Sequence, residues 1–363
     1  MPDLDFSQEE ADRASRYHRP LYLLFAVRLV LGAALYAVLA WTWVGDRLWS
    51  VAHGLGWAGS AALWAVLVVL VSALVGLPLD TWRLRYERRW GFSRETNRGW
   101  AVDKLKGGAI GLSLTTAVWV AVVALGRALP GWWPLPAAAG LALLIVLLAF
   151  VAPVVLEPLF NRFEPLADER LAAELRELAA KAGVPIRDVL VADASRRTTK
   201  SNAYVSGLGA TRRVVLWDTL LESAGEREVK LVIAHELGHR RESHPAKLTA
   251  LFVASALLGV LAVWVVVGTP GPRDLAAAYL VLIGLELVGL PVLTTISRRY
   301  ERVADRWSLD LTHDLEAFER AHVGLARDNL TDLAPPRWAY LLLFTHPTPR
   351  ERLAFGRALA ASA

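Results

Sequence analysis

The sequence contains no cysteine among its 363 residues. Disulfide bonds, thiolate zinc sites and cysteine nucleophiles are therefore excluded, and any metal ion must be held by nitrogen and oxygen ligands. Lysine is scarce, so arginine carries most of the positive charge, as is typical of GC-rich bacterial genomes. The chain also lacks an internal repeat, a low-complexity tract and a glycine-rich phosphate loop. Its information lies instead in its apolar blocks and its histidines.

Hydrophobic residues make up 55% of the chain and are concentrated in blocks. A helix needs about 20 mostly apolar residues to cross a bilayer. A large soluble helical core would show a polar stripe at the helical period, and segments such as ALWAVLVVLVSALVGLPL show none. We therefore expect six membrane spans, at residues 21–44, 57–79, 108–128, 134–155, 248–268 and 275–296.

The positions of arginine and lysine predict the orientation of these spans. The segment 80–107 is rich in basic residues, whereas the three short loops on the other side hold one arginine each. By the positive-inside rule, both termini and the long loops should face the cytoplasm. Attraction to anionic lipid then explains the net charge of +5, and no nucleic acid is needed as a partner. The acidic, polar N-terminus is unlike a cleavable signal peptide, so the first block should remain as an anchor.

The largest polar region, residues 156–247, lies between the fourth and fifth blocks. Its pattern predicts a helix over DERLAAELRELAAKAGV that ends at Gly183 and Pro185. The segments RDVLVAD and RRVVLWD are typical of short strands, with NAYVSG between them and Gly207 and Gly209 at a turn. Ser223 and Glu226 match a capping box, which predicts the start of a second helix, EREVKLVIAHELGHRRES.

That second helix carries His235, Glu236 and His239 in the pattern H-E-x-x-H. Histidines four residues apart lie on one face of a helix and can share one zinc ion. Glu236, one position round the helix, can take a proton from a water molecule at the metal. The alternative, two surface histidines on an amphipathic helix, fits poorly with the small and apolar residues around the motif.

A catalytic zinc site needs a third protein ligand, and the sequence offers three candidates. His244 fails the metzincin pattern, which would require glycine and histidine where this chain has Glu242 and Pro245. Glu242 lies on the same helix, where it could more easily cap the helix or pair with an arginine. Glu301 and Asp305 are four apart after the sixth block, so one carboxylate can bind the metal while the other orients a ligand histidine. Glu301 is the favoured third ligand.

Several segments together resemble the type I CAAX prenyl protease family, whose members are integral-membrane zinc peptidases of the gluzincin class. They are AHELGH, SRRYERVAD, SNAYVSGLGATRRVVLWDTLLE, PLFNRFEPL, THPTPRERLA and the basic segment RYERRWGFSRETNRGWAVDKLK. The resemblance implies one zinc ion per chain, with Glu301 matching the third ligand and Asp305 the aspartate behind a ligand histidine. It also implies that the spans enclose a water-filled chamber which the zinc site faces.

The resemblance implies roles for five further residues. Asn202, Ala203 and Tyr204 match a strand edge on which the family lays its substrate as an added strand; a plain buried strand is the alternative. His346 and Arg352 match residues that face the active site, where a cation can stabilise an oxyanion or hold a substrate carboxylate.

The sequence around the last two residues also predicts local structure. Thr348 is placed as the N-cap of a helix, with Pro349 at its first position and Glu351 completing a capping box. This interpretation explains the TPRE segment and leaves the neighbouring histidine and arginine for the site.

Two features depart from the eukaryotic members, which have seven spans and a histidine at the position of Lys200. Both indicate a bacterial relative in the cell membrane, and both leave the substrate open. The candidates are lipidated CAAX proteins and the damaged membrane proteins that related heat-shock-type proteases cleave. A non-catalytic scaffold or transporter is a further alternative, but it would have no need of Glu236 as a general base.

We therefore predict a multi-pass α-helical membrane protein of about six spans with a cytoplasmic zincin-like α+β metallopeptidase domain. It should hydrolyse peptide bonds of a peptide or protein substrate near the lipid bilayer. The expected parts are a cytoplasmic segment 1–20, four spans in 21–155 with a basic cytoplasmic loop at 80–107, the catalytic domain 156–247, two spans in 248–296, and a cytoplasmic segment 297–363 with the third zinc ligand.

Two charged residues fall inside expected spans: Arg28 in the first and Glu286 in the sixth. A charge in hydrocarbon costs roughly 3 kcal/mol on insertion scales, so such a group normally faces a partner or a wet cavity. Each charge can be neutralised by a neighbour, and Arg28 can also snorkel to the interface. The sharper hypothesis is that Glu286 faces the water-filled chamber leading to the zinc.

The predicted orientation can be tested with reporters fused to the C-terminus. A reporter that works only in the cytoplasm should be active there, because the basic loops hold that end of the chain inside. A fusion that is active only after export would contradict the orientation.

Overall fold

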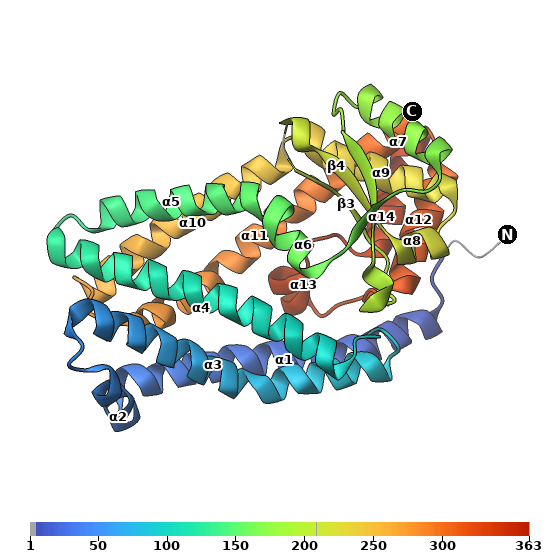
Figure 1. Cartoon of the computed structure of the whole chain (residues 1–363). Helices are drawn as coiled ribbons and strands as arrows, with labels where there is room; N and C mark the ends of the chain where they lie inside the picture. The colour runs from blue at the N-terminus through green and yellow to red at the C-terminus, as the bar shows by residue number, and fades with distance from the viewer. Residues whose placement is uncertain (1–4, 208, 363) are drawn as a thin grey trace.

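The structure is a computed structural model and describes the whole chain except residues 1–4, 208 and 363. Six helices in the described part are long and apolar enough to cross a membrane, which confirms the expected number. Figure 1 shows them running side by side along the length of the molecule, with the sheet and most of the shorter helices at one end and α2 at the other. They are α1 (Gln8–Trp41), α3 (Gly56–Arg89), α4 (Asn97–Ala128), α5 (Pro134–Val151) with its continuation η1 (Ala152–Leu156) and α6 (Glu157–Phe160), α10 (His244–Val267) and α11 (Leu275–Thr312).

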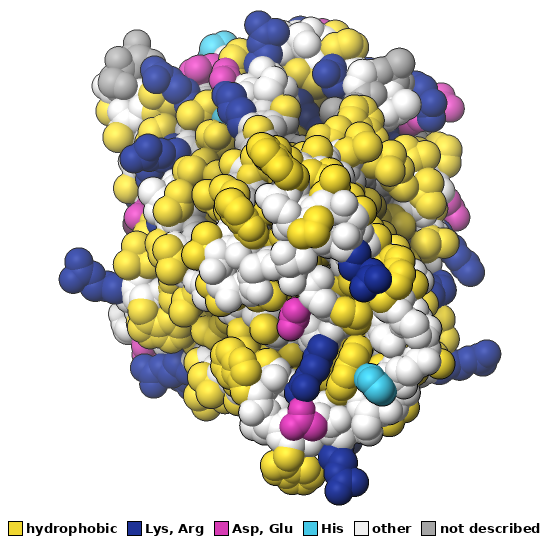
Figure 2. Space-filling view, turned by 90° about the vertical axis from the view of Figure 1, so that its left-hand side faces the viewer, with side chains coloured by type: hydrophobic (Ala, Val, Ile, Leu, Met, Phe, Trp, Pro, Cys, Tyr) yellow, Lys and Arg dark blue, Asp and Glu magenta, His cyan; other side chains and the backbone are white. Residues whose placement is uncertain are grey.

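The six long helices form a ring. Neighbours in contact follow the order α1, α3, α4, α5, α10 and α11, and α11 packs against α1 to close the circle. Between 0% and 17% of the residues in the most apolar stretch of each helix are buried, so most spanning side chains are accessible from outside or inside the ring. Near the end of the ring beside the short helix α2 (Trp43–Ala52), which faces the viewer in Figure 2, Leu39, Trp64, Val123 and Trp133 belong to one cluster of buried apolar side chains.

Arg28 is neutralised by a neighbouring carboxylate, which was one of the two expectations; the other was that it snorkels to the interface. Its guanidinium on α1 donates a hydrogen bond to Asp80 on α3. The ammonium of Lys104 on α4 donates to the other carboxylate oxygen of Asp80 at 2.7 Å. One carboxylate therefore ties three consecutive helices together. Glu286 is exposed on α11, and its place in a water-filled chamber stays a prediction.

The expected basic loop at 80–107 is mostly helical, which corrects the sequence-based interpretation. The helix α3 continues to Arg89 and α4 begins at Asn97, so only residues 90–96 connect them. Apolar length marks the part of a helix that lies in the membrane, whereas arginine, glutamate and lysine are good helix formers that extend it into water. For the same reason α11 runs past the sixth apolar block as far as Thr312.

A four-stranded sheet has the order β1, β2, β4, β3. The inner pair β2 and β4 is parallel, and the two outer pairings are antiparallel, so β3 forms one edge. The two strands expected from the residue pattern, β2 and β4, and the edge strand implied by the resemblance, β3, are present; β1, only three residues long and ending in a proline, was not predicted. The bounds are β1 (Phe163–Pro165), β2 (Asp188–Ala192), β3 (Ala203–Ser206) and β4 (Arg213–Trp217).

The helices α7 (Glu169–Lys181) and α9 (Glu226–Arg241) share a buried core with this sheet. Both were expected from the sequence. Leu175, Val214, Leu216, Ile233 and Leu237 are each 0% exposed in that core. The apolar face of α9 is thereby fixed against the sheet, which leaves its other face for the histidines.

The capping box expected at Ser223 is wrong. The chain forms a separate short helix, α8 (Asp218–Ser223), and α9 begins at Glu226 with Gly225 as its N-cap. The Ser223 hydroxyl instead lies 3.1 Å from the Ser201 hydroxyl. The Ser223 side chain therefore makes a tertiary hydrogen bond instead of capping the helix, as the local pattern had predicted.

The capping box at the last helix is confirmed. The backbone N–H of Thr348 donates to the Glu351 carboxylate at 2.7 Å, and the backbone N–H of Glu351 donates to the Thr348 hydroxyl at 3.3 Å. The last helix and its neighbours pack against α9 and α11, so the two polar regions of the chain form one unit. They are α12 (Leu315–Asp328), α13 (Arg337–Leu343) and α14 (Pro349–Ser362).

Removing the charge of Asp80 should destabilise the protein. In Asp80→Asn, two cations near the membrane lose their shared counter-charge, and we expect a loss of roughly 1–2 kcal/mol and a lower melting temperature in detergent. Asp46→Asn is the matched control, because Asp46 pairs with Arg273 while 61% exposed, and such pairs contribute about 0–1 kcal/mol. Equal melting temperatures for the two variants would contradict the bracing role.

Candidate metal centre

The H-E-x-x-H helix α9 packs directly against α11, the helix that carries the predicted third ligand. Gly238 allows this close approach. A Cβ added there would lie 2.7 Å from the Cβ of Trp307 and 3.3 Å from the Cα of Ala304, both on α11. The glycine inside the motif is therefore required by packing, and it sets the distance between the histidines and the carboxylate that faces them.

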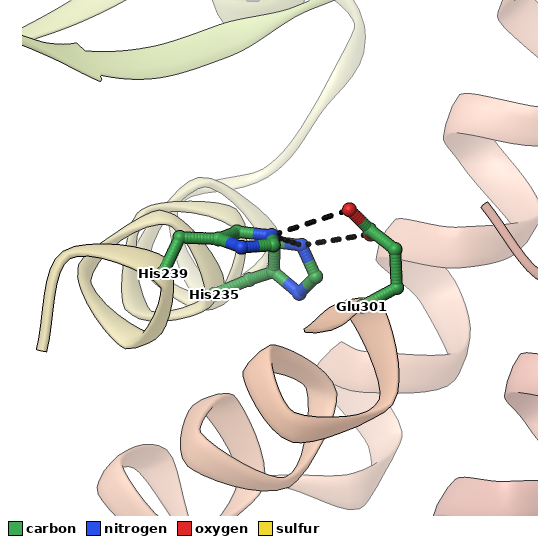
Figure 3. Close-up of side chains that lie close together, drawn as sticks. All are labelled: His235, His239 and Glu301. Carbon is green, nitrogen blue, oxygen red and sulfur yellow. Dashed lines mark hydrogen bonds and ion pairs between the residues drawn. The ribbon is translucent and has the colours of Figure 1, made fainter. Parts of the chain in front are cut away.

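His235, His239 and Glu301 converge on one point, as Figure 3 shows. The Nε2 atoms of the two histidines are 3.1 Å apart. Each also lies 3.3 Å from a different oxygen of the Glu301 carboxylate. All three ligand atoms lie within 4.8 Å of one another. The structure thus brings together the three residues that the sequence predicts as metal ligands, although Glu301 lies 62 residues beyond His239 in the chain.

The chemistry of these atoms fits a metal ion. Oε2 of Glu301 is buried and accepts no hydrogen bond. Lone pairs on two imidazole nitrogens and a carboxylate face one another in a buried site, an arrangement that is costly unless a cation lies between them. Two nitrogen ligands and one oxygen ligand form the donor set of many catalytic zinc sites, and related transition metals accept it too.

Asp305 lies behind the first ligand histidine. It is 0% exposed, and its Oδ1 is 2.9 Å from Nδ1 of His235. Arg352 donates to both carboxylate oxygens of Asp305, with Nε at 2.9 Å from Oδ2. The nitrogen that donates to Oδ1 is also 3.2 Å from Nδ1 of His235. Because a carboxylate and a guanidinium hold the back of the ring, its Nε2 points at Glu301.

Glu236 and His346 lie on the open side of the site. Both line a cavity of about 630 Å³ that also reaches the ligand His235. Burial raises the pKa of the Glu236 carboxyl above its ordinary value. Nε2 of His346 is 3.3 Å from Oε1 of Glu301, and its side chain is 59% exposed. The cavity is thus the space in which a substrate would meet these groups.

The strand edge reaches the same cavity through two of its three predicted residues. Asn202 and Ala203 line it, together with Lys200. The hydroxyl of Tyr204 instead donates to Glu157 at 3.3 Å, because side chains alternate between the two faces of a strand. The carbonyl of Val205 further along accepts from the Arg240 guanidinium at 3.0 Å. The edge open to the cavity is therefore the start of β3.

Two histidines near the site were not predicted in these positions. His322 on α12 lines the cavity and has its Nε2 3.5 Å from Oδ1 of Asp305. His244, considered and rejected as a ligand, has its Nδ1 2.9 Å from Nδ1 of His239. The sequence around His322 is that of an ordinary amphipathic helix and does not indicate a site residue. His244 could have been recognised, because it lies only five residues after His239.

Two protein-family models match this chain, and together they cover nearly its whole length. A family model described as "Peptidase family M48" matches residues 165–360. A second, described as "CAAX prenyl protease N-terminal, five membrane helices", matches residues 3–162. The first therefore spans all three clustered residues, and the second the first four spans.

Individual relatives agree with the family models. The chain is 30% identical over 303 residues to the "Uncharacterized metalloprotease YhfN" of Bacillus subtilis, which covers 78% of this chain and 70% of that protein. It is 27% identical over 362 residues to the "CAAX prenyl protease 1 homolog" of Oryza sativa subsp. japonica, covering 93% and 83%.

A solved structure shares the fold. The crystal structure of Ste24p from S. mikatae superposes with a TM-score of 0.82 at 23% identity, covering 96% of this chain and 89% of that one. The predicted family and fold class are thereby confirmed. The chain belongs to peptidase family M48, as a membrane metalloprotease that carries the N-terminal membrane domain of the CAAX prenyl proteases.

Proposed function

We propose that the protein is a zinc endopeptidase that cleaves peptide bonds at the cytoplasmic face of a bacterial cell membrane. The observation that carries this proposal is the convergence of His235, His239 and Glu301 beside Glu236, at the wall of a cavity large enough for a peptide. The catalytic part would comprise residues 156–247 and 297–363, with the first four spans in 21–155 and the last two in 248–296.

The two histidines and Glu301 would hold one zinc ion through Nε2, Nε2 and a carboxylate oxygen. When bound, zinc supplies Lewis acidity, which lowers the pKa of water and polarises a peptide carbonyl. The Glu236 carboxylate lies next to these ligands without joining them. It would take a proton from the attacking water, whose oxygen bonds to the carbonyl carbon. As the carbon–nitrogen bond breaks, the same group would pass that proton to the leaving amine.

The remaining site residues divide into those near the substrate and those behind the ligands. His346, partly exposed at the cavity, is the residue we assign to the developing oxyanion. The contacts of Arg352 are with Asp305, His235 and Glu301. We propose that Arg352 holds Asp305 and thereby orients His235; a direct role at the oxyanion stays a prediction.

The substrate would bind as an added strand beside β3. Asn202 and Ala203 lie at the edge of the sheet and in the cavity wall, so an extended peptide there can pair with the backbone while it reaches Glu236. Tyr204, on the other face of the strand, would support this edge through its hydrogen bond to Glu157.

Two substrate classes fit this site. The relatives named "CAAX prenyl protease 1 homolog" favour lipidated CAAX-type peptides, which a ring of membrane helices suits. Membrane-protein quality control needs the same chemistry with a different substrate. We favour the first because the resemblance runs through both the membrane part and the peptidase part of the chain.

Two substitutions should separate metal binding from turnover. Glu236→Gln should keep zinc and lower activity by about 10²–10⁴-fold, because the general base is lost while all three ligands remain. Glu301→Ala should lose the bound zinc. Metal analysis of the purified variants and cleavage of a quenched peptide would measure both effects.

Glu242→Gln is the matched control, because Glu242 is the C-cap of α9 and accepts a hydrogen bond from Trp307 at 3.0 Å instead of facing the proposed metal ligands. It should keep both zinc and activity. A zinc-free Glu236→Gln, or a Glu301→Ala that binds zinc normally, would show that the roles are wrongly assigned.

The substrate class can be tested by direct competition. We expect purified protein with zinc to cleave a farnesylated CAAX peptide faster than the same peptide without the lipid, because the lipid holds the peptide at the membrane. An unfolded membrane protein serves as the third substrate. Faster cleavage of the unfolded protein than of the lipidated peptide would favour quality control instead.

A further inference from the structure

The third histidine of the motif region, His244, is held against the metal site by an unusual turn. It is the first residue of the membrane helix α10, yet it is only 2% exposed. The residue before it, Ser243, has φ +56° and ψ +29°, the left-handed conformation that non-glycine residues seldom adopt. This turn between α9 and α10 directs the His244 ring back towards the end of α9. Such backbone strain persists where the surrounding structure fixes it, often at functional sites.

The contact made by His244 is with the nitrogen of His239 that does not face Glu301. Nε2 of His239 is the atom 3.3 Å from Glu301, and its Nδ1 is 2.9 Å from Nδ1 of His244. A neutral imidazole carries one proton, and a ring that binds a metal through Nε2 carries that proton on Nδ1. Nδ1–H of His239 can therefore donate to Nδ1 of His244, which then accepts with its lone pair.

His244 is itself held by the residue next to the third ligand. Its ring stacks on Tyr300, with ring centroids 4.1 Å apart and an interplanar angle of 10°. Tyr300 directly precedes Glu301 on α11. One imidazole thus contacts a ligand on α9 and rests on the neighbour of a ligand on α11, so its position follows the relative placement of the two helices.

We infer that His244 is a positioning residue that fixes the tautomer and ring orientation of His239 for zinc. The inference rests on the proposed function, since it concerns the same metal site. His235 has a carboxylate for this purpose, with Oδ1 of Asp305 at 2.9 Å. The equivalent partner of His239 is the neutral imidazole ring of His244. The two ligand histidines are therefore oriented by different chemistry, and the second partner adds no negative charge to the site.

Two substitutions separate the hydrogen bond from the packing. His244→Phe keeps a ring to stack on Tyr300 but removes the acceptor. His244→Asn loses the ring and keeps an oxygen that can accept near the position of Nδ1. Zinc affinity would be measured by chelator competition on the full-length, metal-free protein in detergent. We expect His244→Phe to bind zinc about 10–100-fold more weakly than wild type, and His244→Asn to recover most of that loss.

The melting temperature of the metal-free protein is the second measurement. This melting temperature should be the same for His244→Phe and wild type. The phenylalanine ring still stacks on Tyr300, and the lost hydrogen bond to His239 matters only when the metal is bound. His53→Phe, at the far end of the ring after α2, is the matched control and should change neither quantity. Wild-type zinc affinity in His244→Phe, an equally weak His244→Asn, or an equal fall in melting temperature with and without zinc would overturn the inference.

Failure of the proposed function would look different. If wild-type protein takes up no zinc, or Glu301→Ala takes up as much as wild type, the metal site itself is wrong. Normal zinc binding by wild type together with unchanged affinity in His244→Phe would remove only the role of His244.

Discussion

The packing of α9 against α11 is the contact on which the site depends. The helix α9 carries two of the three proposed metal ligands and α11 carries the third, and neither helix alone can bind a metal as a catalytic site does. Gly238 permits the approach, because any larger side chain would meet Trp307 and Ala304. The core beneath the sheet fixes the other face of α9. Once these two apolar contacts form, the orientation of the histidines towards Glu301 follows from the helical period.

The two buried carboxylates at the site are energetically costly. Glu301 and Asp305 are 5% and 0% exposed, and buried carboxylates are unfavourable unless they are paired and hydrogen-bonded. Asp305 is satisfied by Arg352 and His235, while one oxygen of Glu301 accepts no hydrogen bond. The group left unsatisfied is the one that faces the proposed zinc. A cation held by Glu301 and the two histidines would satisfy this oxygen.

The membrane ring and the peptidase part share the helices α10 and α11. The first follows the H-E-x-x-H helix after a two-residue turn, and the second carries Glu301 beyond its apolar stretch. The far end of the ring contains a cluster of buried apolar side chains that includes Trp64 and Trp133, while the cavity lies at the end with the sheet. Because the same two helices build both parts, the candidate metal site is joined directly to the membrane-spanning part of the chain.

The sequence by itself predicted the six spans, two of the four strands, the histidine pair, and Glu301 with Asp305; the resemblance added the strand edge at 202–204. These follow from apolar length, local periodicity and fixed spacing, which are properties of neighbouring residues. Only the tertiary structure decided that Asp80 joins Arg28 to Lys104, that Ser223 bonds Ser201 and does not cap α9, and that His322 and His244 surround the ligands. Such contacts depend on which helices meet and at what distance, and no local pattern of residues encodes that meeting.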